Sequence, residues 1–191
     1  MIRAADHFAV DDEGRIGGLP FIASPNCDAR PPGMAIELLV IHAISLPRGI
    51  YQGDAVERLF TNTLDPAAHT EFAPLARLRV SAHFFIRRDG RTLQFVRTLD
   101  RAWHAGVSCW RGRRQCNDFS IGIELEGCDD QPFAEAQYAV LAGLTLALAA
   151  RYPIEAIVGH ADIAPGRKTD PGRGFDWRRL AATTGLTGFI A

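Results

Sequence analysis

The pattern of apolar and polar residues predicts several β-strands. Residues 36–42, Ile-Glu-Leu-Leu-Val-Ile-His, form a nearly continuous apolar run, which is typical of a strand buried on both faces. Residues 119–127 alternate in polarity, and this period of two predicts a strand with one apolar face. A further apolar run at 154–158 predicts a strand that delivers His160 to the loop that follows.

A hairpin and three helices complete the predicted elements. Residues 80–96 predict a β-hairpin, because two apolar runs flank Asp89-Gly90, a pair favoured in two-residue type I′ turns. Apolar residues at helical spacing predict helices over 54–62, 134–152 and 175–182. The long middle helix is amphipathic and is expected to cover the sheet.

Composition and charge limit the class of protein. The chain has 191 residues and a net charge of −1, which suits one domain with a core and argues against nucleic acid as the main partner. Residues 1–35, rich in Pro, Gly and Asp, predict an extended arm that packs on a domain formed by residues 36–191.

Membrane association is not expected either. The longest uncharged run, 136–150, is too short to span a bilayer, and the first 20 residues carry no apolar leader. No Cys-x-x-Cys pair is present, so the cysteines are expected to be free thiols in a cytoplasmic protein.

The stretch 159–172 concentrates chemistry on a loop that follows a strand. It contains His160, Lys168 and Asp170 among glycines and prolines. Together with His42, at the end of the first buried run, His160 and Asp170 supply three ligands of the types that zinc binds. A catalytic zinc site uses three protein ligands and keeps a fourth position for water, so these residues are the candidate metal site.

Two further residues are candidates for catalysis. Glu124 lies on the predicted strand 119–127 beside Gly122, whose missing side chain allows a close approach. It is a candidate general base, with a polar rung on a solvent-facing strand as the alternative. Lys168 is a candidate oxyanion stabiliser, whereas its neighbour Arg167 is expected to be solvated.

Other histidines are open to more than one interpretation. Trp103 and His104 stand on a Gly-containing loop and predict either a groove wall for a sugar or peptide, or a buried Trp with an exposed His. For His83, a hydrogen bond within the sheet is favoured over a metal role. The Arg-rich residues 108–117 predict a solvated loop.

Taken together, these motifs resemble the zinc-dependent N-acetylmuramoyl-L-alanine amidases, and most closely the 1,6-anhydro-N-acetylmuramyl-L-alanine amidase subfamily. The resemblance covers nearly the whole chain after about residue 20, in the same order. The matching stretches are Val-Ile-His-Ala-Ile-Ser-Leu-Pro at 40–47, Leu-Arg-Val-Ser-Ala-His-Phe at 78–84, Ile-Arg-Arg-Asp-Gly at 86–90, Arg-Ala-Trp-His-Ala-Gly-Val-Ser at 101–108, Cys-Asn-Asp-Phe-Ser-Ile-Gly-Ile-Glu-Leu-Glu-Gly at 116–127, and all of 159–172.

The resemblance implies a fold and a reaction. The implied fold class is α/β, a single domain with a mixed central β-sheet flanked by helices, shared with peptidoglycan recognition proteins. The implied reaction is hydrolysis of the amide between the lactyl group of anhydro-muramic acid and L-Ala of the stem peptide, with Zn²⁺ as cofactor. That reaction serves cytoplasmic peptidoglycan recycling and indirectly restrains β-lactamase induction, and no obligate protein partner is implied.

The resemblance also implies roles for single residues. His42, His160 and Asp170 match the zinc ligands of the family, Glu124 its catalytic acid/base, and Lys168 its oxyanion-stabilising lysine. Arg79 is retained and is expected to bind a substrate carboxylate, with Trp103 and His104 as further substrate-binding candidates.

Two positions depart from the subfamily pattern. Ala43 stands where an Asn is common, and Gln115 stands where an Arg is common. These departures bear on substrate affinity and on the preference for the anhydro sugar. Two alternatives stand beside the leading hypothesis: a non-catalytic peptidoglycan-binding module, and an amidase that acts on intact, non-anhydro murein.

Overall fold

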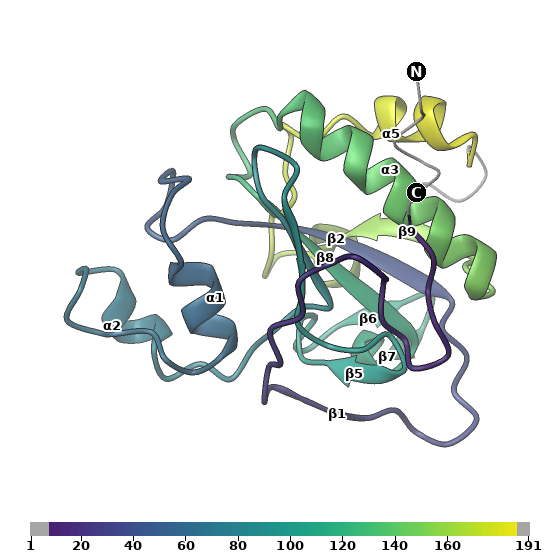
Figure 1. Ribbon diagram of the computed structural model, residues 1–191, viewed down its shortest axis with the longest axis horizontal. Coiled ribbons are helices and arrows are strands. Elements are labelled where there is room, and N and C mark those ends of the chain that lie inside the picture. Colours follow the sequence, from purple (N-terminus) through teal and green to yellow (C-terminus); the bar gives the residue numbers. More distant parts are fainter. Residues whose placement is uncertain (1–7, 187–191) are drawn as a thin grey trace.

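A five-stranded mixed β-sheet forms the centre of the protein in the computed structural model, which describes residues 8–186 (Figure 1). The strand order is β4-β3-β8-β2-β9, and only β4 is antiparallel to its neighbour. The strands are β2 (Leu38–Ile44), β3 (Phe84–Ile86), β4 (Thr92–Gln94), β8 (Ser120–Glu126) and β9 (Ala156–Gly159). The mixed sheet expected from the resemblance is therefore confirmed.

The register of the parallel strands places the candidate residues side by side. His42 on β2 pairs with Glu124 on β8, and Ile41 pairs with Gly159 at the end of β9, directly before His160. All three polar residues thus lie at the carboxyl ends of adjacent parallel strands. Ligand sites in α/β sheets are typically found at this edge.

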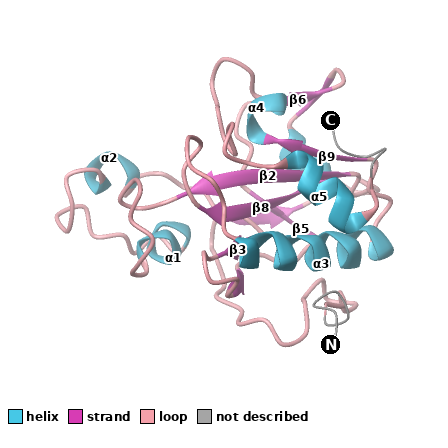
Figure 2. Cartoon of the chain, turned by 90° about the horizontal axis from the view of Figure 1, so that it is seen from above, coloured by secondary structure: helices cyan, strands magenta, loops and turns pink. Residues whose placement is uncertain are grey.

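Two helices cover one face of the sheet. Helix α3 (Glu135–Arg151) packs along it, and α5 (Trp177–Thr184) packs on α3 (Figures 1 and 2). Apolar residues of β2, β3 and β8 meet this layer in the largest core cluster, which includes Leu39, Ile41, Phe84, Ile123, Leu141 and Leu148. The predicted helices 134–152 and 175–182 are confirmed to within two residues at each end.

The other face of the sheet is covered by a long connection and a short helix. The connection runs from β5 (Asp100–Ala102) through the hairpin β6 (Cys109–Trp110) and β7 (Arg113–Arg114) to the 3-10 helix η2 (Cys116–Phe119). Helix α4 (His160–Ile163) lies on the same side, opposite α3 in Figure 2. Strand β2 is therefore buried on both faces, as its apolar run predicts.

A smaller lobe stands at one end of the sheet. It contains α1 (Ala55–Phe60) and α2 (Phe72–Leu75), which lie away from α3 in Figure 1. Apolar side chains of this lobe pack on the sheet through a second cluster that includes Phe60, Phe72, Phe85, Leu93 and Phe95. The lobe forms one wall of the cleft at the carboxyl edge of the sheet.

Residues 8–35 pack closely on the rest of the chain. Ile16 is buried in the main core, and β1 (Cys27–Ala29) pairs antiparallel with β5. The Arg30 guanidinium donates to four main-chain carbonyl oxygens, those of Thr98, Asn117, Asp118 and Ser120. Residues 1–7 of the predicted arm and 187–191 of the predicted domain lie outside the described residues.

Four local predictions need correction. The hairpin turn is not a two-residue type I′ turn, because Arg87 bonds to Arg91 across a three-residue loop in which only Gly90 has positive φ. The stretch 159–172 begins as helix α4 rather than as a loop. Residues 108–117 contain the β6–β7 hairpin and the start of η2. Strand β8 is buried on both faces, so it has no solvent-facing polar side.

Candidate metal centre and active site

His42, His160 and Asp170 converge at the carboxyl edge of the sheet. The Nδ1 atoms of the two histidines are 2.9 Å apart, and Asp170 Oδ2 lies 3.2 Å from the first and 3.1 Å from the second. Both histidines are buried, whereas Asp170 is partly exposed. The structure thus brings together the three residues that the sequence singled out as ligands.

The geometry of this cluster fits a zinc ion. Tetrahedral zinc with bonds of about 2.0–2.2 Å separates its ligand atoms by about 3.3–3.6 Å, a few tenths of an ångström more than the three distances in the cluster. Burial, with some help from neighbouring His160, lowers the pKa of His42 to about 4, so this imidazole is neutral at pH 7. Burial raises the pKa of Asp170, but the neighbouring His160 and His42 imidazoles lower it by more, so the carboxyl is ionised. With both Nδ1 lone pairs and the Asp170 carboxylate facing one another, the three groups repel. A cation bound between them would stabilise this arrangement.

The outward nitrogens of both histidines have partners. His42 Nε2 lies 2.9 Å from His104 Nδ1, and His160 Nε2 lies 3.1 Å from the carbonyl oxygen of Ala105. The carbonyl can only accept, so His160 carries its proton on Nε2 and leaves Nδ1 free for a metal. A hydrogen bond of this type is the usual way to orient a histidine ligand.

Glu124 lies beside the cluster on β8. Its side chain reaches the cleft, but Oε2 is buried and has no hydrogen-bond partner among the described residues. Burial raises the pKa of this carboxyl well above its ordinary range; nearby Asp170 adds to the rise and Lys168 opposes it. A carboxyl with a raised pKa next to a metal-type site is suited to exchange protons. The alternative of a solvent-facing polar strand is wrong, because neighbouring Glu126 is buried and pairs with Arg87.

The two adjacent cations on the loop after α4 differ in their partners. Lys168 is exposed and, together with Asp170, lines both pockets of the cleft at the carboxyl edge of the sheet. Arg167 donates from Nη2 to the carbonyl oxygens of Ala105, at 2.8 Å, and Val107, at 2.7 Å. Arg167 is exposed, as expected of a solvated cation, but it also binds the connection between β5 and η2 through these two carbonyl oxygens.

The cleft has two arms that meet at the cluster. One arm, of about 340 Å³, is lined by charged and polar side chains that include Arg48, Glu71, Asp129 and Thr169. The other, of about 240 Å³, is lined mainly by apolar side chains that include Leu46, Phe60, Leu75 and Val80. Ala43, Lys168 and Asp170 border both arms.

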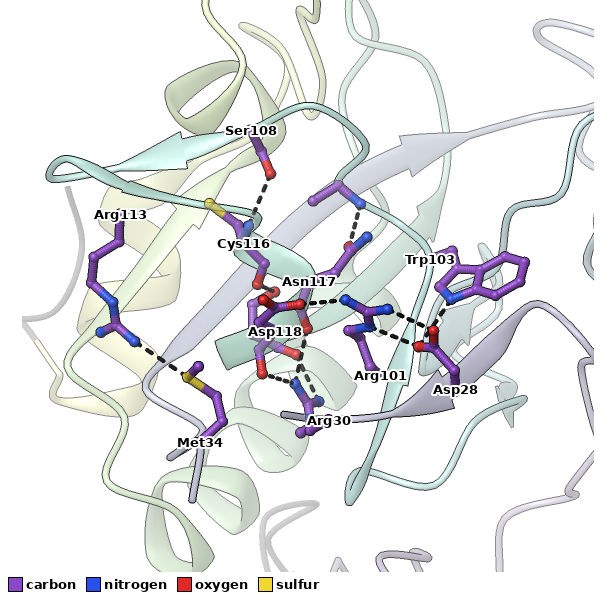
Figure 3. Close-up of polar contacts among 12 residues, drawn as sticks. Asp28, Arg30, Met34, Arg101, Trp103, Ser108, Arg113, Cys116, Asn117 and Asp118 are labelled. Atoms are coloured by element: carbon purple, nitrogen blue, oxygen red, sulfur yellow. Dashed lines mark hydrogen bonds and ion pairs between the residues drawn. The ribbon is translucent and has the colours of Figure 1, made fainter. Parts of the chain in front are cut away.

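The predicted substrate-binding residues are placed differently from one another. His104 lines the apolar arm but uses both ring nitrogens in hydrogen bonds to His42 and Ser120. Trp103 lines neither arm and donates its indole N–H to Asp28 at 3.1 Å (Figure 3). Arg79 is exposed between two residues of the apolar arm, Leu78 and Val80.

His83 forms hydrogen bonds within the sheet, as predicted. Its Nδ1 accepts from the Gly122 amide at 3.0 Å, and its Nε2 lies 3.1 Å from the Asp100 carbonyl oxygen. Of the two departures from the subfamily pattern, Ala43 lies in the cleft, whereas Gln115 is exposed and lines neither arm.

Sequence reasoning missed the groups that hold the connection between β5 and η2. Asn117 Oδ1 accepts from the backbone amides of His104, at 3.2 Å, and Ala105, at 2.8 Å. The motif Cys-Asn-Asp contains this residue, but nothing in the sequence indicates which backbone it binds. The four cysteines, which the structure describes throughout, are free thiols.

The fold and the cluster together define a class of protein: a single-domain α/β protein with a potential three-ligand metal site at the carboxyl edge of a mixed sheet. The family model described as N-acetylmuramoyl-L-alanine amidase matches residues 32–173. Since this is well over half of the chain, the protein belongs to the N-acetylmuramoyl-L-alanine amidase family. It is therefore a hydrolase that acts on an amide bond.

Two relatives show to which members of the family the chain is similar. The chain is 54% identical over 173 residues to the 1,6-anhydro-N-acetylmuramyl-L-alanine amidase AmpD of Citrobacter freundii, covering 90% of this chain and 92% of the relative. A crystal structure of a selenomethionine AmpD derivative superposes with a TM-score of 0.88 at 53% identity, covering 90% of this chain and 97% of that one. The subfamily resemblance seen in the sequence is confirmed.

More distant structures share the fold. The Escherichia coli amidase AmiD, solved with the substrate anhydro-N-acetylmuramic acid-L-Ala-D-γ-Glu-L-Lys, is 33% identical with a TM-score of 0.60 over 85% of this chain and 62% of that one. Drosophila PGRP-LB, at 18% identity and a TM-score of 0.58 over 88% and 90% of the two chains, shares the fold alone. The expected peptidoglycan-recognition-protein type of fold is thus confirmed. Among the described residues, no helix is long and apolar enough to cross a membrane.

Proposed function

We propose that the protein is a zinc-dependent amidase that cleaves the amide between the lactyl group of 1,6-anhydro-N-acetylmuramic acid and L-Ala of the stem peptide. The observation that carries the proposal is the convergence of two imidazole Nδ1 atoms and one carboxylate oxygen beside Glu124 in the cleft. Relatives named for this reaction support the choice of substrate. A role in cytoplasmic peptidoglycan recycling is part of the same proposal.

His42, His160 and Asp170 would hold the metal ion. When bound, zinc supplies a Lewis acid for the scissile carbonyl and lowers the pKa of a coordinated water to about 7. The chain's own contribution is a fixed set of ligand atoms at a partly enclosed edge of the sheet. The Ala161 amide donates to the Asp170 carbonyl oxygen at 2.9 Å, which ties the ligand-bearing loop to α4.

Glu124 and Lys168 would handle the proton and the charge. Glu124 takes a proton from the attacking water and returns it to the leaving amine, and its raised pKa suits both steps. Lys168 places an ammonium at the junction of the two arms, where the former carbonyl oxygen gains negative charge. The two arms, one polar and one largely apolar, share this junction and suit a substrate with a sugar on one side of the scissile bond and a peptide on the other.

The test combines metal analysis with turnover. We expect one zinc per chain and release of the stem peptide from an anhydro-muramyl peptide, faster than from its non-anhydro counterpart. Glu124→Gln should keep zinc and lose about 10²–10⁴-fold in kcat, whereas Glu155→Gln, on an exposed residue outside the cleft, should behave as the parent.

Each alternative has its own outcome. Binding of the muropeptide without turnover by the parent protein would identify a recognition module instead. Faster cleavage of the non-anhydro substrate would overturn the proposed specificity, and Ala43 in the cleft is the residue to exchange for Asn in that case. Fractionation of the source cells tests the cytoplasmic location.

A further inference from the structure

We propose that the consecutive residues His104 and Ala105 act as a positioning clamp for the metal centre. The clamp holds both histidine ligands in the tautomer that directs Nδ1 toward the ion. This inference rests on the zinc site of the proposed function. It assigns His104 a role toward the ligands rather than toward the substrate.

The first observation is that two adjacent residues contact both ligands. His104 Nδ1 lies 2.9 Å from His42 Nε2, and the Ala105 carbonyl oxygen lies 3.1 Å from His160 Nε2. Because His42 lies on β2 and His160 at the start of α4, a single short segment fixes the relative orientation of their rings. His42 and His104 meet edge to face, with ring centroids 5.0 Å apart.

The second observation is a one-way chain of hydrogen bonds behind His42. With Nδ1 turned to the metal, His42 donates from Nε2 to His104 Nδ1, and His104 must then carry its own proton on Nε2. That nitrogen lies 3.1 Å from Ser120 Oγ, and the Ser120 hydroxyl donates to the Cys116 carbonyl oxygen at 2.6 Å. Every donor in this series of hydrogen bonds has an acceptor. The Cys116 carbonyl, Ser120 and His104 therefore together specify the tautomer of His42.

The third observation explains why β8 has a glycine at position 122. A Cβ there would lie 2.4 Å from His104 Cγ and 2.6 Å from its Nδ1. The backbone does not require glycine at this position, since positive φ is not found there. Gly122 therefore makes room for the imidazole of the clamp.

The fourth observation is that the clamp is held from behind. Asn117 Oδ1 accepts from the amides of both His104 and Ala105. Arg167 donates to the same Ala105 carbonyl that accepts from His160. A buried acceptor shared by a ligand and a guanidinium is fixed in place, as outer partners of metal ligands usually are.

The experiment measures zinc affinity by competition with a chelator. His104→Phe keeps a ring but removes the acceptor, and Gly122→Ala displaces the ring without changing its chemistry. Both should lose about 10–100-fold in zinc affinity. A matched control should stay within about three-fold of the parent, less than the usual effect of an outer partner: Gly127→Ala, whose Cβ would lie equally close, 2.4 Å, to Phe133.

A conservative pair tests the anchor. Asn117→Ala removes the acceptor of both amides and should weaken zinc binding, whereas Asn117→Asp keeps an oxygen in place and should retain most of it. Thermal unfolding with and without zinc separates the roles, because ligand stabilisation depends on affinity. A positioning role lowers the increase in Tm that zinc produces, while a purely structural role lowers Tm equally in both states.

The outcomes are distinct. If the parent protein does not bind zinc, the proposed function fails and the clamp fails with it. If the parent binds zinc tightly and folded His104→Phe and Gly122→Ala bind it equally well, only the clamp is overturned. A rise in KM with unchanged zinc affinity in His104→Phe would overturn it too, in favour of substrate binding. Should His104→Phe not fold, Gly122→Ala and the Asn117 pair decide.

Discussion

Lys168 and Arg167 are neighbours with opposite surroundings. Arg167 donates hydrogen bonds to two carbonyl oxygens of the β5–η2 connection. Lys168 lines both arms of the cleft, and its charge opposes the rise in the pKa of Glu124. Only Lys168 is therefore placed to stabilise negative charge that develops on a substrate carbonyl oxygen.

Lys168→Ala is predicted to lower kcat by ~10²–10³-fold with little change in KM, the effect of losing one oxyanion donor. Steady-state kinetics at saturating zinc measures it, with Arg178→Ala, an exposed cation on α5, as the control. Arg167→Ala should instead weaken zinc binding, because Arg167 holds the Ala105 carbonyl that orients His160. A large loss of kcat in Arg167→Ala and none in Lys168→Ala would assign the oxyanion role to Arg167.

At the scale of residues, the candidate metal ligands were easier to predict than the groups that orient them through hydrogen bonds. His42, His160 and Asp170 follow apolar runs or sit in a Gly- and Pro-rich loop, and their side-chain chemistry is specific. The Ala105 carbonyl that orients His160 has no such signature, because any residue has one. Asn117 binds amides twelve and thirteen residues away, which only the folded chain brings near.

At the scale of elements, the N-terminal segment is attached through Arg30. Its buried guanidinium donates to carbonyl oxygens on both sides of the clamp segment, at Thr98 and at residues 117, 118 and 120. Burial lowers the pKa of Arg30 to about 10, so it remains charged at pH 7. A composition rich in Pro and Gly predicts an extended arm but does not reveal this anchor.

Arg30→Ala is predicted to lower the free energy of unfolding by about 3 kcal/mol or more, because several buried carbonyl oxygens lose a charged donor. Arg30→Lys should recover little of it, since an ammonium cannot reproduce the planar fork. Urea unfolding of the metal-free protein measures both. Arg58→Ala, which removes an exposed ion pair with Asp54, should cost less than about 1 kcal/mol. An equal effect of the Arg30 and Arg58 variants would show that the arm does not support the fold.

Elements with a clear period were predicted well, and those set by tertiary contacts were not. Strand β2 and helix α3 follow from their apolar patterns. Helix α4 begins at His160 in a stretch of glycines and prolines, where Asp162 accepts from the Gly159 amide at 2.6 Å. Strand β8 has polar residues at alternate positions, but these face His104, the cleft and Arg87 instead of forming an open polar surface.

At the scale of the whole molecule, several buried ionisable groups link stability to pH. Burial lowers the pKa of His42, to about 4, and also lowers those of His83 and His104 below their usual range. Burial raises the pKa of Glu124. The histidines and the carboxyl therefore act in opposite directions, and their contributions must be separated by mutation.

The metal-free Glu124→Gln protein is predicted to lose stability steadily as the pH falls from about 6.5 to about 4. In this range the unfolded chain protonates its histidines, while the folded chain keeps His42 neutral. The unfolded state therefore binds more protons and is stabilised relative to the folded state as the pH falls. For His42 alone the full effect is about 3 kcal/mol, and His83 and His104 act in the same direction.

Glu124 opposes them in the parent protein, because its folded form keeps a proton above pH 4.5 that the unfolded form releases. The parent should therefore show a shallower slope than Glu124→Gln. Urea unfolding in chelator at pH 7.5, 6.0 and 5.0 checks both slopes. A free energy of unfolding that does not change with pH in Glu124→Gln would mean that the folded protein protonates these histidines as readily as the unfolded chain does.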